Sequence, residues 1–114
     1  MTNYEKVREF HKKFKRPIDL KDPPAEQAAF RIALVEEEFN ELKEAVAAND
    51  RVKILDGIAD VLYATYGMAV EYGFDADEAF ARVHESNMSK EMTRGTGKLA
   101  KGADFRPVDL ADLV

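Results

Sequence analysis

The chain has 114 residues, enough for one domain with its own hydrophobic core. Hydrophobic residues make up 46% of it and its net charge is -5, which indicates a globular protein without a general attraction for nucleic acid. The absence of cysteine excludes disulfides, thiolate zinc sites and cysteine nucleophiles. No apolar segment resembles a signal peptide or reaches membrane-spanning length. We therefore expect a cytoplasmic protein that binds neither nucleic acid nor membranes.

The first predicted helix covers residues 3–16. Large apolar or aromatic side chains recur there at helical spacing: Tyr4, Val7, Phe10 or His11, and Phe14. A basic cluster closes the segment, as suits a helix C-terminus, and Pro17 stops the helix.

A second helix is predicted over about residues 25–48, after two prolines. Its apolar stripe consists of Phe30, Leu34, Leu42 and Ala45. Glu38 and Glu41 fall on the same narrow face, whereas Glu37 lies at its edge. Burying unpaired carboxylates is very costly, so protonation, a protein cation or a metal ion has to neutralise them.

A third helix is predicted over about residues 52–72, capped near Asp50 and closed by Gly73. The short connection makes it an antiparallel neighbour of the second helix. It is apolar almost all round, so we predict that a second copy of the chain covers it, in an obligate homo-oligomer. The sequence does not separate a dimer from a tetramer. Asp56 and Asp60 lie one turn apart on one face of this helix.

A fourth helix is predicted from the cap residue Asp75 to about Met88, with Glu78 completing a capping-box pattern. The segment after it is rich in turn residues and locally basic, through Lys90, Arg94, Lys98, Lys101 and Arg106. It is compatible with a short hairpin or an arm, although we favour a flexible terminus. The prediction is thus a single all-α domain over 1–114, a four-helix bundle (1–88) with a basic C-terminal arm (89–114).

Two facing helices that both present carboxylates inward indicate a cation site. Like charges do not stay ionised in a core without a cation among them, and Mg²⁺ or Mn²⁺ prefers carboxylate oxygens. No Glu-x-x-His pair is present, which argues against a di-iron site. The competing interpretation is a purely structural bundle, because a Glu-x-x-Glu pair on a helix is usually solvated surface.

The acidic pattern resembles that of a known superfamily. Glu37-Glu38-x-x-Glu41, followed by Asp60 on the next helix, is similar to the signature of the all-α NTP pyrophosphohydrolases, which include MazG-type proteins, dimeric dUTPases and phosphoribosyl-ATP pyrophosphohydrolases. Further segments resemble the MazG-like branch of bacteria and phages: Val7-x-x-Phe10-His11-x-x-Phe14, Asp60-Val-Leu-Tyr63-x-x-Tyr66-Gly67, Val83-His84-x-Ser86-Asn87-Met88-Ser89-Lys90 and Gly97-Lys98-x-x-Lys101-Gly102. The chain departs from the pattern at Gly57, where the family has Glu. Asp56 lies one position earlier and can substitute for it.

This resemblance implies Mg²⁺-dependent hydrolysis of a nucleoside triphosphate to the monophosphate and pyrophosphate, in nucleotide-pool cleaning. It implies Glu38, Glu41 and Asp60 as metal ligands supported by Asp56, and Glu37 and Glu38 as the catalytic carboxylates. The substrate-binding residues that it implies are Asn87, Lys90, Lys98, Lys101, Phe14 and His11. Two alternatives stay open: hydrolysis of phosphoribosyl-ATP, and a non-catalytic helical dimer that only binds nucleotides.

Overall fold

The computed structural model of the chain describes residues 1–93, 95 and 97–114. It is all-α, as predicted, with four α-helices and one very short hairpin in its described part. The helices are α1 (Asn3–Lys13), α2 (Ala25–Ala47), α3 (Arg51–Tyr72) and α4 (Ala76–Met88). The chain forms two compact units, Met1–Phe74 and Asp75–Val114. Within the described residues, no helix combines the length and the hydrophobicity needed to cross a membrane.

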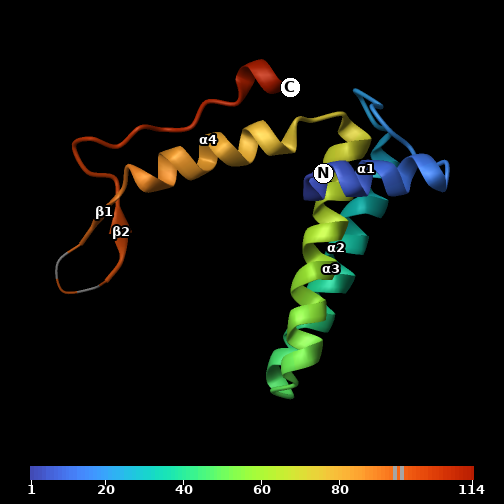
Figure 1. Ribbon diagram of the computed structural model, residues 1–114, viewed down its shortest axis with the longest axis horizontal. Coiled ribbons are helices and arrows are strands. Elements are labelled where there is room, and N and C mark those ends of the chain that lie inside the picture. Colours follow the sequence, from blue (N-terminus) through green and yellow to red (C-terminus); the bar gives the residue numbers. More distant parts are fainter. Residues whose placement is uncertain (94, 96) are drawn as a thin grey trace. The chain divides into compact units, whose positions relative to one another are not determined.

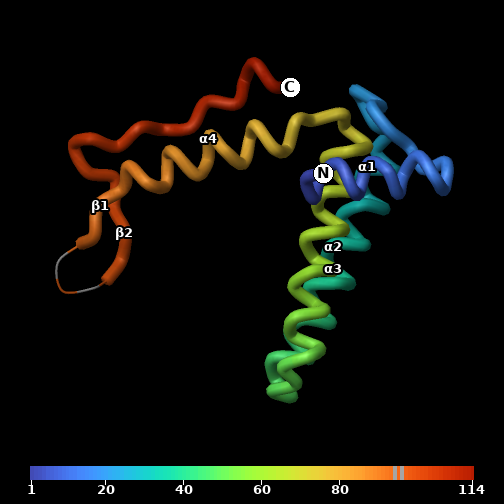
Figure 2. The backbone as a smooth tube through the Cα atoms, in the orientation of Figure 1, coloured from blue at the N-terminus to red at the C-terminus, as the bar shows by residue number. Residues whose placement is uncertain are grey.

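In the first unit, α2 and α3 run side by side as a helical hairpin, and α1 packs against α3 (Figures 1 and 2). The carboxylate of Asp50 caps α3 by accepting a hydrogen bond from the backbone N–H of Lys53 (3.2 Å). Gly73 ends α3 with a positive φ of 73°, as the sequence predicts. α1 ends at Lys13, earlier than predicted, because Lys15 takes a left-handed conformation (φ 54°) before Pro17 is reached.

A buried ion pair joins α2 to α3. Arg31 Nε lies 3.2 Å from Oε2 of Glu71, and both side chains are almost fully buried. Gln27 Nε2 donates to Oε1 of Glu71 (2.6 Å), and Arg31 Nη2 donates to the carbonyl oxygen of Ala64 (2.7 Å). The guanidinium lies so close to Gly67 that a Cβ there would collide with it. Glycine is therefore needed at this position to let the arginine pass between the helices.

The second unit consists of α4, the hairpin and a short 3-10 helix. Asp75 caps α4 through the N–H of Glu78 (3.0 Å), as predicted. The strands β1 (Glu91–Met92) and β2 (Leu99–Ala100) pair antiparallel, with Glu91 opposite Ala100. The 3-10 helix η1 (Ala111–Leu113) is fastened to α4 because Arg82 binds Asp112 with two hydrogen bonds (2.6 and 3.1 Å). The described part of this segment therefore contains the short hairpin that the sequence left open as an alternative, whereas Arg94 lies outside the described residues.

Candidate active site

The predicted carboxylates lie on two facing helices, with Glu37, Glu38 and Glu41 on α2 and Asp56 and Asp60 on α3. Glu38 and Asp60 are half-buried, whereas the other three are exposed. Glu41 is thus more exposed than expected, although its side chain lines the space between α2 and α3. Its exposure follows from the rotation of α2, which places Ala45 and Leu42 in the close contact with α3. Phe30, predicted in the core stripe, is likewise 47% exposed.

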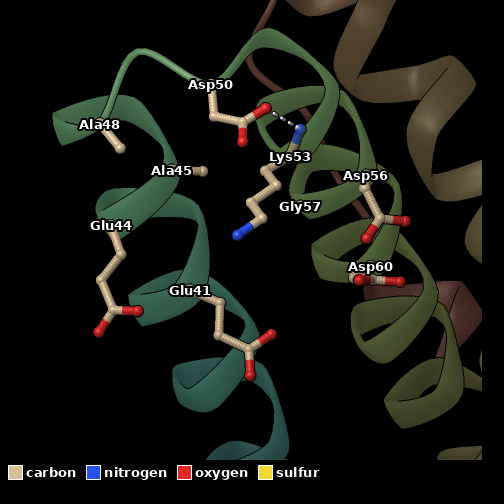
Figure 3. A pocket seen from close by; sticks show the side chains of 9 residues that line it. All are labelled: Glu41, Glu44, Ala45, Ala48, Asp50, Lys53, Asp56, Gly57 and Asp60. Atoms are coloured by element: carbon tan, nitrogen blue, oxygen red, sulfur yellow. Dashed lines mark hydrogen bonds between the residues drawn. The ribbon is translucent and has the colours of Figure 1, made fainter.

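Glu41, Asp56 and Asp60 share a cavity of about 520 Å³, which we call the acidic pocket. The pocket is lined by Glu41, Glu44, Ala45, Ala48, Asp50, Lys53, Asp56, Gly57 and Asp60 (Figure 3). Five of these nine residues are acidic and one is basic, so the pocket carries a strongly negative potential. Such a pocket attracts cations, or an anion that arrives with cations bound to it.

Gly57, the departure from the family pattern, is buried where α2 and α3 approach closely. A Cβ at this position would lie 3.2 Å from Leu42 Cδ1 and 3.3 Å from Leu42 Cα. A larger side chain would press against the backbone of α2, which has little freedom to move. In this chain, the carboxylate nearest to Gly57 on the same helix is that of Asp56, one position earlier.

Glu38 lies in the least favourable electrostatic environment of these carboxylates. Its Oε2 atom is buried and has no hydrogen-bond partner. Burial, and then the negative charges of Glu41 and Asp60, raise the pKa of Glu38 above its usual value. In the described part of the chain, however, no three His, Cys, Asp or Glu side chains are grouped tightly enough to hold a metal ion. The metal-ligand set therefore stays a prediction.

A second cavity of about 260 Å³, which we call the aromatic pocket, reaches Glu38 and Asp60 from the side of α1. It is lined by Phe10, His11, Arg16, Phe30, Arg31, Leu34, Glu38, Asp60, Tyr63 and Ala64. Asp60 lines both pockets, so the two cavities meet at a proposed metal ligand. The aromatic pocket combines ring faces, which suit a nucleobase, with two guanidinium groups.

Of the two residues predicted to flank a base, the structure brings only His11 into the aromatic pocket. His11 Nδ1 lies 2.9 Å from the carbonyl oxygen of Pro17, which only accepts, so this nitrogen carries a proton. Phe14 is 55% exposed and packs on Phe10 instead, with the ring centroids 4.8 Å apart. Phe10 itself was missed as a pocket residue, because helical periodicity left it and His11 as equal candidates for one core position.

The second unit contains a cavity of about 360 Å³ that unites three of the predicted substrate-binding residues. Asn87, Lys90 and Lys101 line it, together with Val83, Ser86, Phe105, Pro107 and Val108. The ammonium of Lys101 lies 5.3 Å from the ring centroid of Phe105. Lys98, just before β2, is not among the lining residues.

Residues 7–87 match the model of the family described as phosphoribosyl-ATP pyrophosphohydrolase. The chain belongs to this family. It is thereby a member of the MazG-like all-α NTP pyrophosphohydrolase superfamily, as the resemblance implied. The chain is also similar to the uncharacterized protein L479 of Acanthamoeba polyphaga mimivirus, with 35% identity over 82 residues. That match covers 67% of this chain and 33% of the viral protein, so the chain spans about a third of its relative's length.

The match to the phosphoribosyl-ATP pyrophosphohydrolase family covers the part of the chain that carries the carboxylates. Both pockets that meet at Asp60 lie within the first unit, and every residue that lines them falls inside the matched range. Hydrolysis of a pyrophosphate bond is the activity to which this family points.

Proposed function

We propose that the protein is an Mg²⁺-dependent nucleotide pyrophosphohydrolase, which converts a (d)NTP and water into the (d)NMP and pyrophosphate. The observation that carries this proposal is the meeting of an aromatic pocket and an acidic pocket at Asp60, in a chain of a pyrophosphohydrolase family. A nucleotide has the same two-part character, with a flat apolar base at one end and a charged phosphate chain at the other.

The carboxylate oxygens of Glu38, Glu41 and Asp60 are the kind of ligand that a hard divalent cation prefers. The buried oxygen of Glu38 lacks a partner, and the like charges around it raise its pKa, as expected for a carboxylate that a cation would neutralise. The residues that would hold Mg²⁺ or Mn²⁺ are Glu38, Glu41 and Asp60, with Asp56 in support. When bound, the metal would screen the negative charge of the phosphates and lower the pKa of a coordinated water.

Other side chains would orient the attacking water and bind the base of the nucleotide. Glu37 is exposed next to the ligand set and can orient the attacking water as a general base. Phe30 and Tyr63 offer ring surface to the base in the aromatic pocket, and Arg16 offers donors there. In the second unit, Lys90 and Lys101 line a separate cavity whose two ammonium groups suit an anion.

Phosphoribosyl-ATP is the second candidate substrate, and the name of the matched family favours it. Phosphoribosyl-ATP presents the same phosphate chain as a nucleotide but a bulkier base with a second ribose phosphate. Its hydrolysis would use the same carboxylates, so only substrate preference separates the two reactions.

The proposal is tested by incubating the protein with Mg²⁺ and a panel of canonical dNTPs, NTPs, damaged nucleotides and phosphoribosyl-ATP. We expect release of pyrophosphate and a monophosphate, with the highest kcat/KM for a nucleoside triphosphate. A clear preference for phosphoribosyl-ATP would establish the alternative. If no compound of the panel is hydrolysed but nucleotides bind, the protein is a binder rather than an enzyme.

Glu38→Gln tests the ligand assignment, with Glu36→Gln on the exposed part of the same helix as its matched control. We expect Glu38→Gln to lose more than about tenfold in kcat/KM and Glu36→Gln to keep it. Mg²⁺ should also raise the Tm of the parent by mass action, and EDTA should reverse the increase. A Glu38→Gln variant with the activity and the Mg²⁺ response of the parent would show that the ligand set is wrong.

A further inference from the structure

Arg31 is a buried cation that borders the aromatic pocket, and it has no role in the function proposed above. Only 9% of the residue is exposed, yet it is one of the residues that line this cavity. Its guanidinium lies against Gly67, where a Cβ would collide with Nη2. A charged group that is buried beside a cavity can contact the molecule that fills the cavity.

The surrounding protein fixes the orientation of this guanidinium. Nε of Arg31 lies 3.2 Å from Oε2 of Glu71, and Nη2 donates to the carbonyl oxygen of Ala64 (2.7 Å). Glu71 is itself held by Gln27, whose Nε2 donates to Oε1 (2.6 Å). Among the described residues no hydrogen-bond partner contacts Nη1, and Nη1 is not one of the buried polar atoms that lack a partner. Nη1 is therefore the nitrogen that Arg31 has left for a ligand in the pocket.

The chemistry of this nitrogen favours one class of nucleobase. A guanidinium only donates hydrogen bonds, so a fixed Nη1 requires an acceptor on the ligand. The exocyclic carbonyl oxygens of guanine, hypoxanthine, uracil and thymine accept, whereas the exocyclic amino groups of adenine and cytosine donate. An amino group placed against Nη1 would bring two donors together and leave both without a partner, which is costly in a buried site.

The place of Arg31 along α3 determines which edge of the base it would meet. The sugar and phosphates would lie near Asp60, the proposed metal ligand at which the two pockets meet. Ala64, which Arg31 binds, lies one turn further along α3, and Gly67 lies about 10 Å from Asp60 along the helix axis. A base between these points would turn the edge farthest from its sugar toward Nη1. This edge carries the exocyclic group at position 6 of a purine or position 4 of a pyrimidine.

We propose that Arg31 selects nucleotides whose base carries a carbonyl oxygen at this edge over nucleotides that carry an amino group there. The preferred substrates are thus those of guanine, hypoxanthine, uracil and thymine, and the disfavoured ones are those of adenine and cytosine. This inference rests on the proposed function and names the substrate class of the same site.

Two pairs of substrates test the inference, because the members of each pair differ only at this edge. dITP has a carbonyl oxygen where dATP has an amino group, and dUTP and dCTP form the same contrast among pyrimidines. With Mg²⁺, we expect kcat/KM to be at least about tenfold higher for dITP than for dATP and for dUTP than for dCTP, chiefly through a lower KM. Equal or inverted values in either pair would overturn the inference, while hydrolysis itself would still support the proposed function.

Variants show whether Arg31 is the source of the preference. Arg31→Met combined with Glu71→Met removes the guanidinium without leaving a buried charge, since two apolar side chains replace an ion pair at little cost in stability. This double variant should have similar kcat/KM values for the two members of each pair. The matched control is Arg8→Met with Asp19→Asn, which removes another arginine–carboxylate pair (2.7 Å) of the same unit, outside the aromatic pocket and without changing the net charge. The control should keep the parental ratios.

A folded double variant that keeps the parental preference would overturn the inference, because another donor, such as Arg16, would then read the base. If the double variant does not fold, the two substrate ratios of the parent still decide.

Binding without turnover separates the inference from the proposed function. Isothermal titration calorimetry with the α,β-imido analogues of dUTP and dCTP, in the presence of Mg²⁺, should show about tenfold tighter binding of the dUTP analogue by the parent. The same preference in a protein that hydrolyses none of the four nucleotides would support the inference and contradict the proposed function. A protein that neither binds nor hydrolyses any of them would contradict both.

Discussion

Glu38 has to lose its proton before it can bind a cation, and its surroundings oppose that loss. Burial contributes most to the raised pKa of Glu38, and the charges of Glu41 and Asp60 add to it. A carboxyl group whose pKa is raised by folding contributes stability that is complete below its unfolded pKa and is lost as the pH rises through its folded pKa. Once ionised, Glu38 therefore destabilises the metal-free protein.

The first prediction concerns the pH dependence of this destabilisation. In EDTA at about pH 7, Glu38→Gln should have a higher Tm than the parent, because the amide mimics the protonated carboxyl without its charge. The difference should shrink as the pH is lowered, because the parent then takes up the proton itself. Thermal melts of both proteins across this range measure the effect, and Glu36→Gln shows what an exposed glutamate contributes. A difference in Tm that grows on acidification would contradict the raised pKa.

At the scale of elements, the contact between α2 and α3 depends on Gly57, and this leads to the second prediction. Alanine in place of a helical glycine normally adds about 1 kcal/mol of stability, whereas overpacking a close contact costs about 1–3 kcal/mol. The Cβ of Gly57→Ala would lie 3.3 Å from Leu42 Cα, a backbone atom, so overpacking should prevail and the variant should be less stable. Urea unfolding measures this, and Ala59→Gly, at an exposed position of α3, calibrates the propensity of the same helix. A Gly57→Ala variant more stable than the parent would show that the helices separate easily.

The buried ion pair between α2 and α3 leads to the third prediction. Arg31→Met should cost about 3–5 kcal/mol of unfolding free energy, because it leaves Glu71 charged, buried and bound only by Gln27. Adding Glu71→Met should recover most of that loss, since two apolar side chains replace a buried pair at little cost. A double-mutant cycle by urea denaturation gives the coupling energy. Purely additive effects of the two substitutions would contradict the coupling seen in the structure.

The helices and their caps could be predicted from the sequence because these signals are local. Asp50, Gly73 and Asp75 mark helix ends within a few residues of the chain, and the structure places the ends there. The pairing of Arg31 with Glu71 could not be predicted, since it joins positions 40 residues apart. The exposure of Glu41 was equally out of reach, because periodicity defines a helix face but not the rotation at which a neighbouring helix meets it.

The same limit applies to the candidate site. The carboxylate pattern was visible as a resemblance, whereas the aromatic pocket depends on where α1 packs and brings Phe10 and Arg16 to Asp60. Long-range packing thus decides which residues surround the acidic cluster.

At the scale of the whole molecule, the described part of the chain buries few apolar side chains. Only Val7, Ala45 and Val70 are buried hydrophobic residues there. Large apolar side chains of α3 stay in contact with solvent, with Val52 79% exposed and Leu55 70% exposed. A protein of this length needs a larger core than three residues provide, and contiguous exposed apolar surface usually marks an interface. The predicted homo-oligomer would supply the missing burial.

The last prediction follows from that exposed surface. The parent should sediment above its monomer mass of 12.9 kDa at micromolar concentration, as a dimer or a tetramer. Leu55→Glu should shift it toward the monomer, because a carboxylate placed between two apolar helix faces would have to be desolvated without a partner. Val114→Glu is the control, since it adds the same charge at a residue that is 83% exposed at the chain end. Analytical ultracentrifugation of the three proteins measures their masses in solution. A parent that sediments as a stable monomer would contradict the predicted oligomer. If Leu55→Glu keeps the parental mass, another face forms the interface. The Tm of the oligomer should also fall when dilution dissociates it, because each monomer then exposes the apolar side chains of α3 to solvent.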